Sequence, residues 1–164
     1  MKALSNLSVR DLNETDREAY SSLVLDVFDE FVAPHWSPEG IETFHQTSPE
    51  EAKERFSDEL FIRLGAESNG ELVGVLMMSL SGHLYAIFVA GHAQRSGVGR
   101  RLLKEGLTRM LRANPSVSEI TSNAAPNSVQ AHESFGFETM GPEIETSGIR
   151  VMRMRAAISA LRLE

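Results

Sequence analysis

The sequence contains no cysteine among its 164 residues. A disulfide framework, a thiolate metal site and a cysteine nucleophile are therefore excluded. It also lacks an apolar run near the roughly 20 residues that a helix needs to cross a bilayer, and its first twenty residues lack the apolar stretch of a secretory signal. These absences favour a cytoplasmic protein that does not act at a membrane.

Positive charge is also scarce. The chain has 16 Lys and Arg against 23 Asp and Glu, a net charge of −7, which argues against a nucleic-acid partner. Residues 1–60 hold 14 acidic and 5 basic residues, or −9, so residues 61–164 carry +2. Within the latter, residues 95–112 hold six basic residues and one acidic residue. This stretch would either bind an anion or form a solvated helix face.

The remaining composition is that of an ordinary globular protein, with 41% apolar and 24% charged residues. The chain contains no internal repeat, low-complexity tract or linker. Its length suits one compact domain with its own core. We therefore expect a single domain over residues 1–164.

The first part of the chain predicts one strand and three helices. Residues 7–12 alternate apolar and polar side chains, as a half-buried strand does. Capping boxes at 15–18 and 48–51 predict two helix starts, and the Ser-Pro pair at 37–38 predicts another between them. We expect the first helix to reach about Val32 and the third to end near Phe56.

The second part predicts a sheet with one crossover. An Asn-Gly pair at 69–70 between apolar runs over 59–67 and 71–80 indicates a hairpin. The further predicted elements are strands over 83–89, 118–124 and 148–156, one more strand just before the last of these, and helices over 100–112 and 126–137. The two strands around the first of these helices would be parallel. The order predicts an α/β (α+β) fold, with a mixed, mostly antiparallel seven-stranded sheet, a central parallel pair and flanking helices.

The stretch QRSGVG, residues 94–99, lies between a predicted strand and a basic helix. Its two glycines allow a tight turn and a close ligand, and free amides at a helix start favour a phosphate. Arg100 and Arg101 stand where a Walker loop needs Lys and Ser or Thr, and Leu102 replaces the third glycine of a dinucleotide-binding fingerprint. Both of those motifs are excluded, whereas a glycine pair that serves packing alone remains an alternative.

The stretches IFVAGHAQRSGVGRRLL and PNSVQAHESFGF resemble two motifs of the GNAT superfamily of acetyl-coenzyme A-dependent N-acetyltransferases. The order of predicted elements agrees with that family along the whole chain. The stretch FVAPHWSPEGIETF resembles a bacterial subgroup of uncharacterised members. The resemblance implies the GNAT fold and acetyl-CoA as the cosubstrate. Members of the family are often dimers, so a homodimer is a further expectation.

The resemblance also assigns cofactor-binding roles. Backbone amides of the glycine loop would hold the coenzyme A diphosphate; the loop residues are Gln94, Arg95, Ser96, Gly97, Val98, Gly99 and Arg100. Backbone groups of Phe88 and Val89 would bind the pantetheine arm, and Asn127 would contact the cofactor from the second helix. In the family the acyl group passes directly to the amine, in agreement with the absence of a cysteine.

Two histidines are candidate catalytic residues. His83 lies eleven residues before Gln94, where one branch of the family has a basic Glu. It would take the amine proton directly or through a water, or else it faces solvent at the start of a strand. The tyrosine that often serves as the family's acid is absent, because Ala131 and His132 occupy its motif. Either His132 protonates the thiolate, or it is a surface residue and water does so.

Candidate substrate-binding residues are Trp36, Glu39 and Tyr85. Trp36 would stack on the acceptor or anchor the packing of two helices. Tyr85, a further candidate acid, would contact the substrate or pack in the core. Glu39 and Asp29 belong to an acidic N-terminal region that would attract a cationic amine, unless they are simply solvated. The histidines outside these motifs lack metal-ligand spacing, so no metal is expected.

The sequence therefore predicts an acyltransferase that moves the acetyl group of acetyl-CoA to a primary amine. The acceptor would be a small, cationic molecule or a protein amino group. The alternative is a non-catalytic sensor or regulatory module that binds coenzyme A. A third possibility is an interaction protein with no affinity for coenzyme A. Release of the coenzyme A thiol with an amine present distinguishes the enzyme from the other two.

Overall fold

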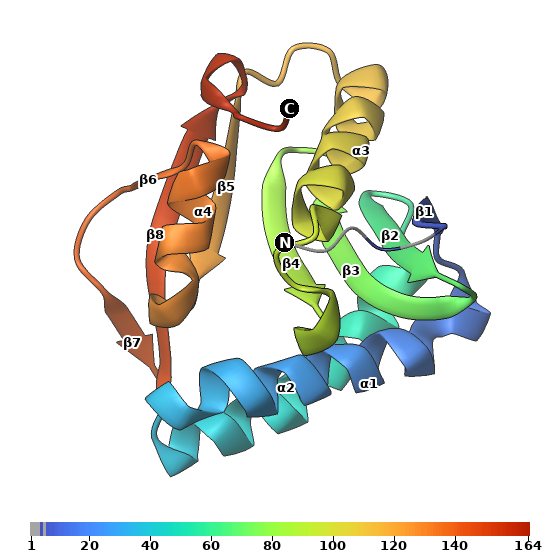
Figure 1. Ribbon diagram of the computed structural model, residues 1–164. Helices are drawn as coiled ribbons and strands as arrows, with labels where there is room; N and C mark the ends of the chain where they lie inside the picture. Colours follow the sequence, from blue (N-terminus) through green and yellow to red (C-terminus); the bar gives the residue numbers. More distant parts are fainter. Residues whose placement is uncertain (1–3, 5) are drawn as a thin grey trace.

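The computed structural model describes residue 4 and residues 6–164 (Figure 1). Those residues form an eight-stranded sheet in the order β1-β2-β3-β4-β5-β8-β6, and β7 pairs with β8 outside this path. The strands are β1 (Ser8–Asp11), β2 (Phe61–Ser68), β3 (Glu71–Ser79), β4 (His83–Val89), β5 (Glu119–Ala124), β6 (Glu138–Thr139), β7 (Ile144–Thr146) and β8 (Ile149–Ala157). The α-helices are α1 (Arg17–Val27), α2 (Pro38–Phe56), α3 (Val98–Ala113) and α4 (Val129–Phe135).

The predicted fold class is confirmed. Only the β4–β5 pair is parallel within the described part of the chain, and the other pairs are antiparallel. The strand count differs, with eight strands instead of seven. The difference arises after α4, where the sequence predicts two strands and the structure has three; β6 and β7 have two and three residues and are too short for a periodic pattern.

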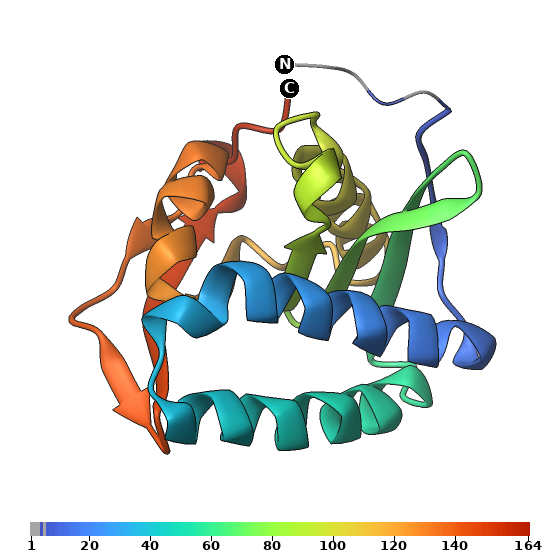
Figure 2. The same cartoon turned by 60° about the horizontal axis from the view of Figure 1, so that its bottom comes forward.

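Helices cover both faces of the sheet (Figures 1 and 2). Alternate residues of β3 point to opposite sides. Leu76 and Met78 belong to the core beneath α3, whereas Val75 and Met77 belong to the core that contains residues of α1 and α2. All four side chains are fully buried. The sheet is therefore the middle layer of three, and β3 is one of its interior strands.

The parallel pair separates soon after it begins. Within the described residues, β4 and β5 pair at His83–Thr121 and Leu84–Ser122, and the strands then diverge (Figure 1). Helix α2 spans both halves of the sheet (Figure 2). Its first turn contacts the β7–β8 turn, where a Cβ on Gly40 would lie 2.1 Å from the Gly148 oxygen. Phe56 at its other end packs against Tyr20 of α1.

The predicted capping box at Thr15 and Glu18 is wrong. The box lies two residues earlier, where the Asn13 side chain accepts from the Thr15 amide and the Asp16 carboxylate accepts from the Asn13 amide. It caps a short 3-10 turn, η1 (Glu14–Asp16), that leads into α1. Asn and Asp satisfy these amides as well as Thr and Glu do, so the sequence contained two overlapping capping signals.

The predicted break before Ser48 is also wrong, because α2 runs through Pro49 without interruption. A proline inside a helix costs about 3 kcal/mol. The helix continues because Phe44, Ala52 and Phe56 share one face and pack into the same core. Two separate helices could not keep these three side chains in line, so burial outweighs the lost hydrogen bond.

The end of the first helical region agrees with the prediction. After α1 the chain makes a wide helical turn, η2 (Phe28–Val32), in which the Ala33 amide donates to the Phe28 oxygen. A 3-10 turn with Pro34, η3 (Ala33–His35), follows. No helix in the described part of the chain is long and apolar enough to span a membrane.

Candidate functional site

A cavity of about 890 Å³ lies where β4 and β5 separate. All seven residues of β4 line it, together with the end of β5, the loop before α3, and residues of α4. Residues of α1, η2 and α2 line its other side. Because β5 has turned away, the edge of β4 beyond Leu84 has no neighbouring strand on that side among the described residues.

The glycine loop forms one end of this cavity, with its conformation set by local bonds. Gln94 Nε2 donates to the Val89 oxygen at 3.0 Å, and the Ser96 hydroxyl donates to the Ala93 oxygen. Arg95 and Gly97 have φ angles of 61° and 86°. Nothing lies within 4 Å of a Cβ built on Gly97. Gly97 is therefore needed for its backbone angle, and the space beside it is open.

The first turn of α3 points unpaired amides into the same region. The first helical hydrogen bond runs from the Arg101 amide to the Gly97 oxygen, so the preceding amides have no intrahelical acceptor. Gly99 meets a different need. A Cβ there would lie 3.3 Å from Phe135 Cζ, so this glycine lets α4 approach α3 closely. The arrangement suits an anion at the helix start.

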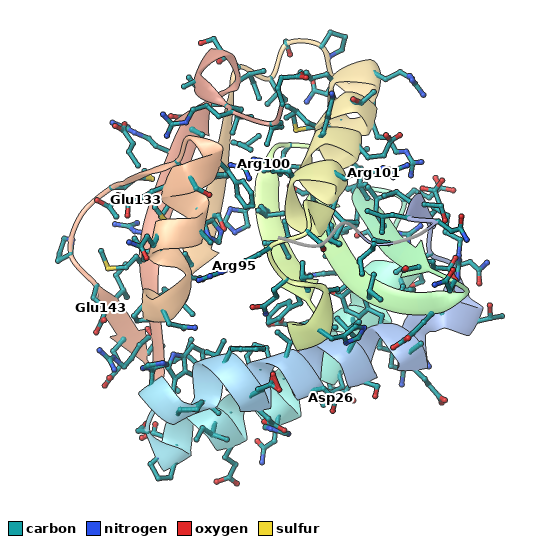
Figure 3. The ribbon with its side chains drawn as sticks, viewed as in Figure 1. Asp26, Arg95, Arg100, Arg101, Glu133 and Glu143 are labelled. Carbon is teal, nitrogen blue, oxygen red and sulfur yellow. The ribbon has the colours of Figure 1, made fainter. Side chains whose placement is uncertain are left out.

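Two arginines reinforce this end. Arg95 and Arg100 line the cavity, in the space between α3 and α4 (Figure 3). Other basic residues of the helix face elsewhere: Arg101 donates to the Leu7 oxygen, and Arg109 pairs with Asp11. The basic stretch predicted from the sequence therefore does not form one patch, and two of its charges reach the cavity.

His83 lies where the two strands part. Its Nδ1 is 2.7 Å from the Thr121 hydroxyl, its ring is edge-on to Tyr85, and it lines the cavity. Burial, and secondarily the charge of Arg55, lower the pKa of this half-buried imidazole. Neutral His83 therefore predominates near pH 7.

His132 is buried, which contradicts the surface alternative. It is 5% exposed, and its Nδ1 lies 2.9 Å from the Ser128 oxygen. A carbonyl only accepts, so Nδ1 carries a hydrogen. Burial lowers the pKa, although the bond to Ser128 opposes this. In the neutral ring, Nε2 therefore accepts from the Ser122 hydroxyl at 3.1 Å.

Aromatic side chains line the wall of the cavity formed by the helical region. Phe28 stacks on Phe44 with ring centroids 4.0 Å apart, and Trp36 meets both edge-on. The Trp36 indole nitrogen is buried and has no hydrogen-bond partner among the described residues. Tyr85 also lines the cavity and is 43% exposed.

Comparison with known proteins decides the family. A sequence profile of the acetyltransferase (GNAT) domain matches residues 32–158, most of the chain. The chain belongs to the GNAT acetyltransferases. No curated protein gave a significant match.

Solved structures support the GNAT fold. A GCN5-related N-acetyltransferase from Rhodopseudomonas palustris superposes with a TM-score of 0.81 at 16% identity, over 96% of this chain and 99% of that one. The PaiA N-acetyltransferase from Thermoplasma acidophilum, in complex with coenzyme A, gives 0.74 at 18% identity, over 93% and 99%. An aminoglycoside 6′-N-acetyltransferase complexed with coenzyme A gives 0.64 at 12% identity, over 92% and 97%.

The GNAT resemblance had named most of the residues that the structure brings together. Phe88, Val89 and Asn127 line the same cavity as the glycine loop. The Asn127 amide donates to the Phe31 oxygen of η2 at 2.8 Å, which ties the turn before α4 to the opposite wall. Glu39 and Asp29 do not line the cavity; Glu39 is exposed on the first turn of α2, and Asp29 pairs with His45.

Sequence reasoning missed Arg55, Glu51 and Thr121. Arg55 and Glu51 line the cavity from α2, and Thr121 holds His83 from β5. Glu51 entered the sequence analysis only as part of a predicted capping box, and Arg55 and Thr121 belong to no functional motif. The His83–Thr121 pairing could have been found from the predicted parallel pair, but its register was not assigned. Within the described residues, no group of three or more His, Asp or Glu side chains could hold a metal ion.

Proposed function

We propose that this GNAT acetyltransferase moves the acetyl group of acetyl-CoA directly to a primary amine. The observation that carries the proposal is one cavity lined by the glycine loop at one end and by a neutral histidine, His83, at the other. A small-molecule amine and a protein amino group are both compatible with this arrangement. The acceptor is considered further below.

The residues present fit coenzyme A. Amides at 94–100, together with Arg95 and Arg100, would hold the diphosphate, since the loop is open beside Gly97. The free edge of β4 at Phe88 and Val89 offers backbone groups to the pantetheine arm. Asn127 would approach from the α4 side. When bound, the thioester supplies an activated acetyl group.

Transfer forms a carbon–nitrogen bond and breaks the carbon–sulfur bond. The amine must lose a proton, and the thiolate must gain one. We assign the first step to Nε2 of His83, directly or through a water. If Nδ1–H donates to Thr121, Nε2 holds the lone pair that accepts the proton. Thr121 is then a positioning residue for the base.

His132 is the candidate acid, acting through the Ser122 hydroxyl that it contacts. This route needs a protonated imidazole, and burial lowers the pKa of His132. The acid route therefore predicts that activity falls as pH rises through a value below about 6.5, whereas protonation of the thiolate by water predicts no such fall. A pH profile of wild-type and His132→Gln protein distinguishes the two.

The deciding experiment is calorimetric titration with acetyl-CoA, followed by thiol release with a panel of amines. Because the chain has no cysteine, any thiol detected comes from coenzyme A. We expect binding, and release that depends on the amine. Binding without release on any amine would favour the sensor alternative. No binding would refute the proposal.

Thr121 provides the test of the base. Thr121→Val keeps the shape of the side chain and removes the hydroxyl, whereas Thr121→Ser keeps the hydroxyl. A lost positioning bond of about 0.5–1.5 kcal/mol corresponds to a decrease of about 2- to 12-fold in kcat/KM. We expect this loss in Thr121→Val, with a shift of the acidic limb of the pH profile, where His83 becomes protonated, and recovery in Thr121→Ser. An unchanged profile in Thr121→Val would exclude this role.

A further inference from the structure

The acceptor end of the cavity contains a cation that no motif predicted. Arg55 lies on α2 and lines the cavity, with its guanidinium carbon 4.1 Å from the centroid of the Tyr85 ring. It is also 5.6 Å from the Phe61 ring. When a guanidinium packs against aromatic rings, its N–H groups can still donate hydrogen bonds within the plane of the guanidinium. These contacts would hold Arg55 ready to bind a planar anion.

The acidic charge of the N-terminal region is nearly absent from this cavity. Of the carboxylates that the structure describes, Glu51 is the one that lines it. The Glu51 carboxylate is 3.5 Å from the Arg55 guanidinium and its side chain is 52% exposed. An ion pair this exposed is weak, so Glu51 competes little with a bound carboxylate for Arg55. The expectation of a cationic acceptor rested on Glu39 and Asp29, which lie outside the cavity. The charges at the site therefore indicate a different class of acceptor.

Tyr85 brings Arg55 and the candidate base together. The His83 ring centroid is 4.5 Å from that of Tyr85, and Arg55 stacks on the same tyrosine. The two groups are close enough that the charge of Arg55 contributes to the lowered pKa of His83. A small molecule could therefore contact both groups at once.

We propose that the acceptor is an amine that also carries a carboxylate, which Arg55 binds while the amino group faces His83. The inference rests on the proposed acetyl transfer. A guanidinium binds a carboxylate through two parallel hydrogen bonds, a geometry that lysine cannot supply. Tyr85, which lies against Arg55 and lines the cavity, would pack against an apolar side chain of the acceptor. A free amino acid with an apolar side chain fits this description, whereas a protein N-terminus has lost that carboxylate to its first peptide bond.

The test compares L-phenylalanine with L-phenylalaninamide, and L-methionine with L-methioninamide, as acceptors. The amide of each pair has the less basic amine, so its free-base fraction near neutral pH is larger and works against our expectation. We expect kcat/KM for the acid to exceed that for the amide by at least about 10-fold. Arg55→Gln should remove this preference by slowing the acid much more than the amide, whose rate changes only through the altered pKa of His83. Arg55→Lys should restore it only in part.

Lys53→Gln is the matched control, because it removes the same charge from the same helix at an exposed position outside the cavity. It should keep the wild-type preference. A second measurement does not require turnover. The protein is saturated with coenzyme A and titrated with N-acetyl-L-phenylalanine or with N-acetyl-L-phenylalaninamide. The acid should bind more tightly to wild-type protein and lose that advantage in Arg55→Gln.

The outcomes separate the two proposals. If acetyl-CoA does not bind, acetyl transfer itself is refuted. If acetyl-CoA binds but wild-type protein neither acetylates nor binds the acid in preference to the amide, the assignment of Arg55 is overturned and the proposed transfer stands. Equal losses on acid and amide in Arg55→Gln would also overturn it, since they would show a structural role for Arg55.

Discussion

Substitutions at Gly97 test the glycine loop, because the backbone angle of this residue and the open space beside it can be probed separately. With φ at 86°, an alanine there would adopt a left-handed conformation, at a cost of about 1–2 kcal/mol. Nothing within 4 Å would oppose its Cβ, so no steric cost is added. For a chain of this size, that cost lowers the thermal midpoint by about 2–8 °C. If the loop instead relaxes in the free protein, the cost reappears on binding, as a loss of affinity for coenzyme A of about 5- to 30-fold.

Gly70→Ala is the matched control. Gly70 has a φ of 79°, likewise with nothing within 4 Å, in the β2–β3 turn outside the cavity. It should lose similar stability and bind coenzyme A normally. Gly97→Asn adds bulk while tolerating the left-handed angle, so it should keep most of its stability and lose affinity for coenzyme A. Differential scanning fluorimetry and calorimetry measure the two quantities. The reasoning is refuted if Gly97→Ala changes neither quantity, or if Gly97→Asn binds coenzyme A as tightly as wild type.

Three further predictions concern stability. Because burial lowers the pKa of His132, the unfolded chain binds more protons than the native chain below about pH 6.5. The free energy of unfolding should therefore decrease as the pH is lowered below that value, by up to about 1.4 kcal/mol per pH unit for this group. Denaturant titrations should show a smaller fall in His132→Gln, and an equal fall would contradict the burial argument. Gly40→Ala places a Cβ 2.1 Å from the Gly148 oxygen and should destabilise by about 1–3 kcal/mol, although alanine normally favours a helix. A gain in urea midpoint would show that this contact yields easily. Leu102→Ala, at a fully buried position of α3, should cost about 2–5 kcal/mol in the same titration; a loss below 1 kcal/mol would contradict its place in the core.

Local signals predicted most of the fold. The hairpin at 69–70 forms with both residues at positive φ, and Gly136 ends α4 at a φ of 109°. These features depend on residues close in the chain, where few conformations are available. The errors at Thr15 and Pro49 arose where one local signal competed with another signal or with packing. The path of α2 depends on burial against residues far away in the sequence, which capping rules do not take into account.

The candidate site was predicted unevenly for a related reason. The glycine loop is continuous in sequence, so its motif carries its geometry. Arg55, Tyr85 and His83 meet only because α2 lies across the sheet, and neither composition nor spacing encodes that meeting. Glu39 shows the opposite failure: regional charge predicted a role that the orientation of α2 does not allow.

The short pairing of β4 with β5 also bears on how the molecule opens. The two halves of the sheet share backbone bonds over little of their length, and much of what joins them is α2 with its contacts at Gly148 and Tyr20. Native-state hydrogen exchange should therefore resolve two cooperative units, with amides of β5 and β8 exchanging through a lower-energy opening than those of β2 and β3. A ligand lodged between the strands would bridge these units and bring their protection closer together.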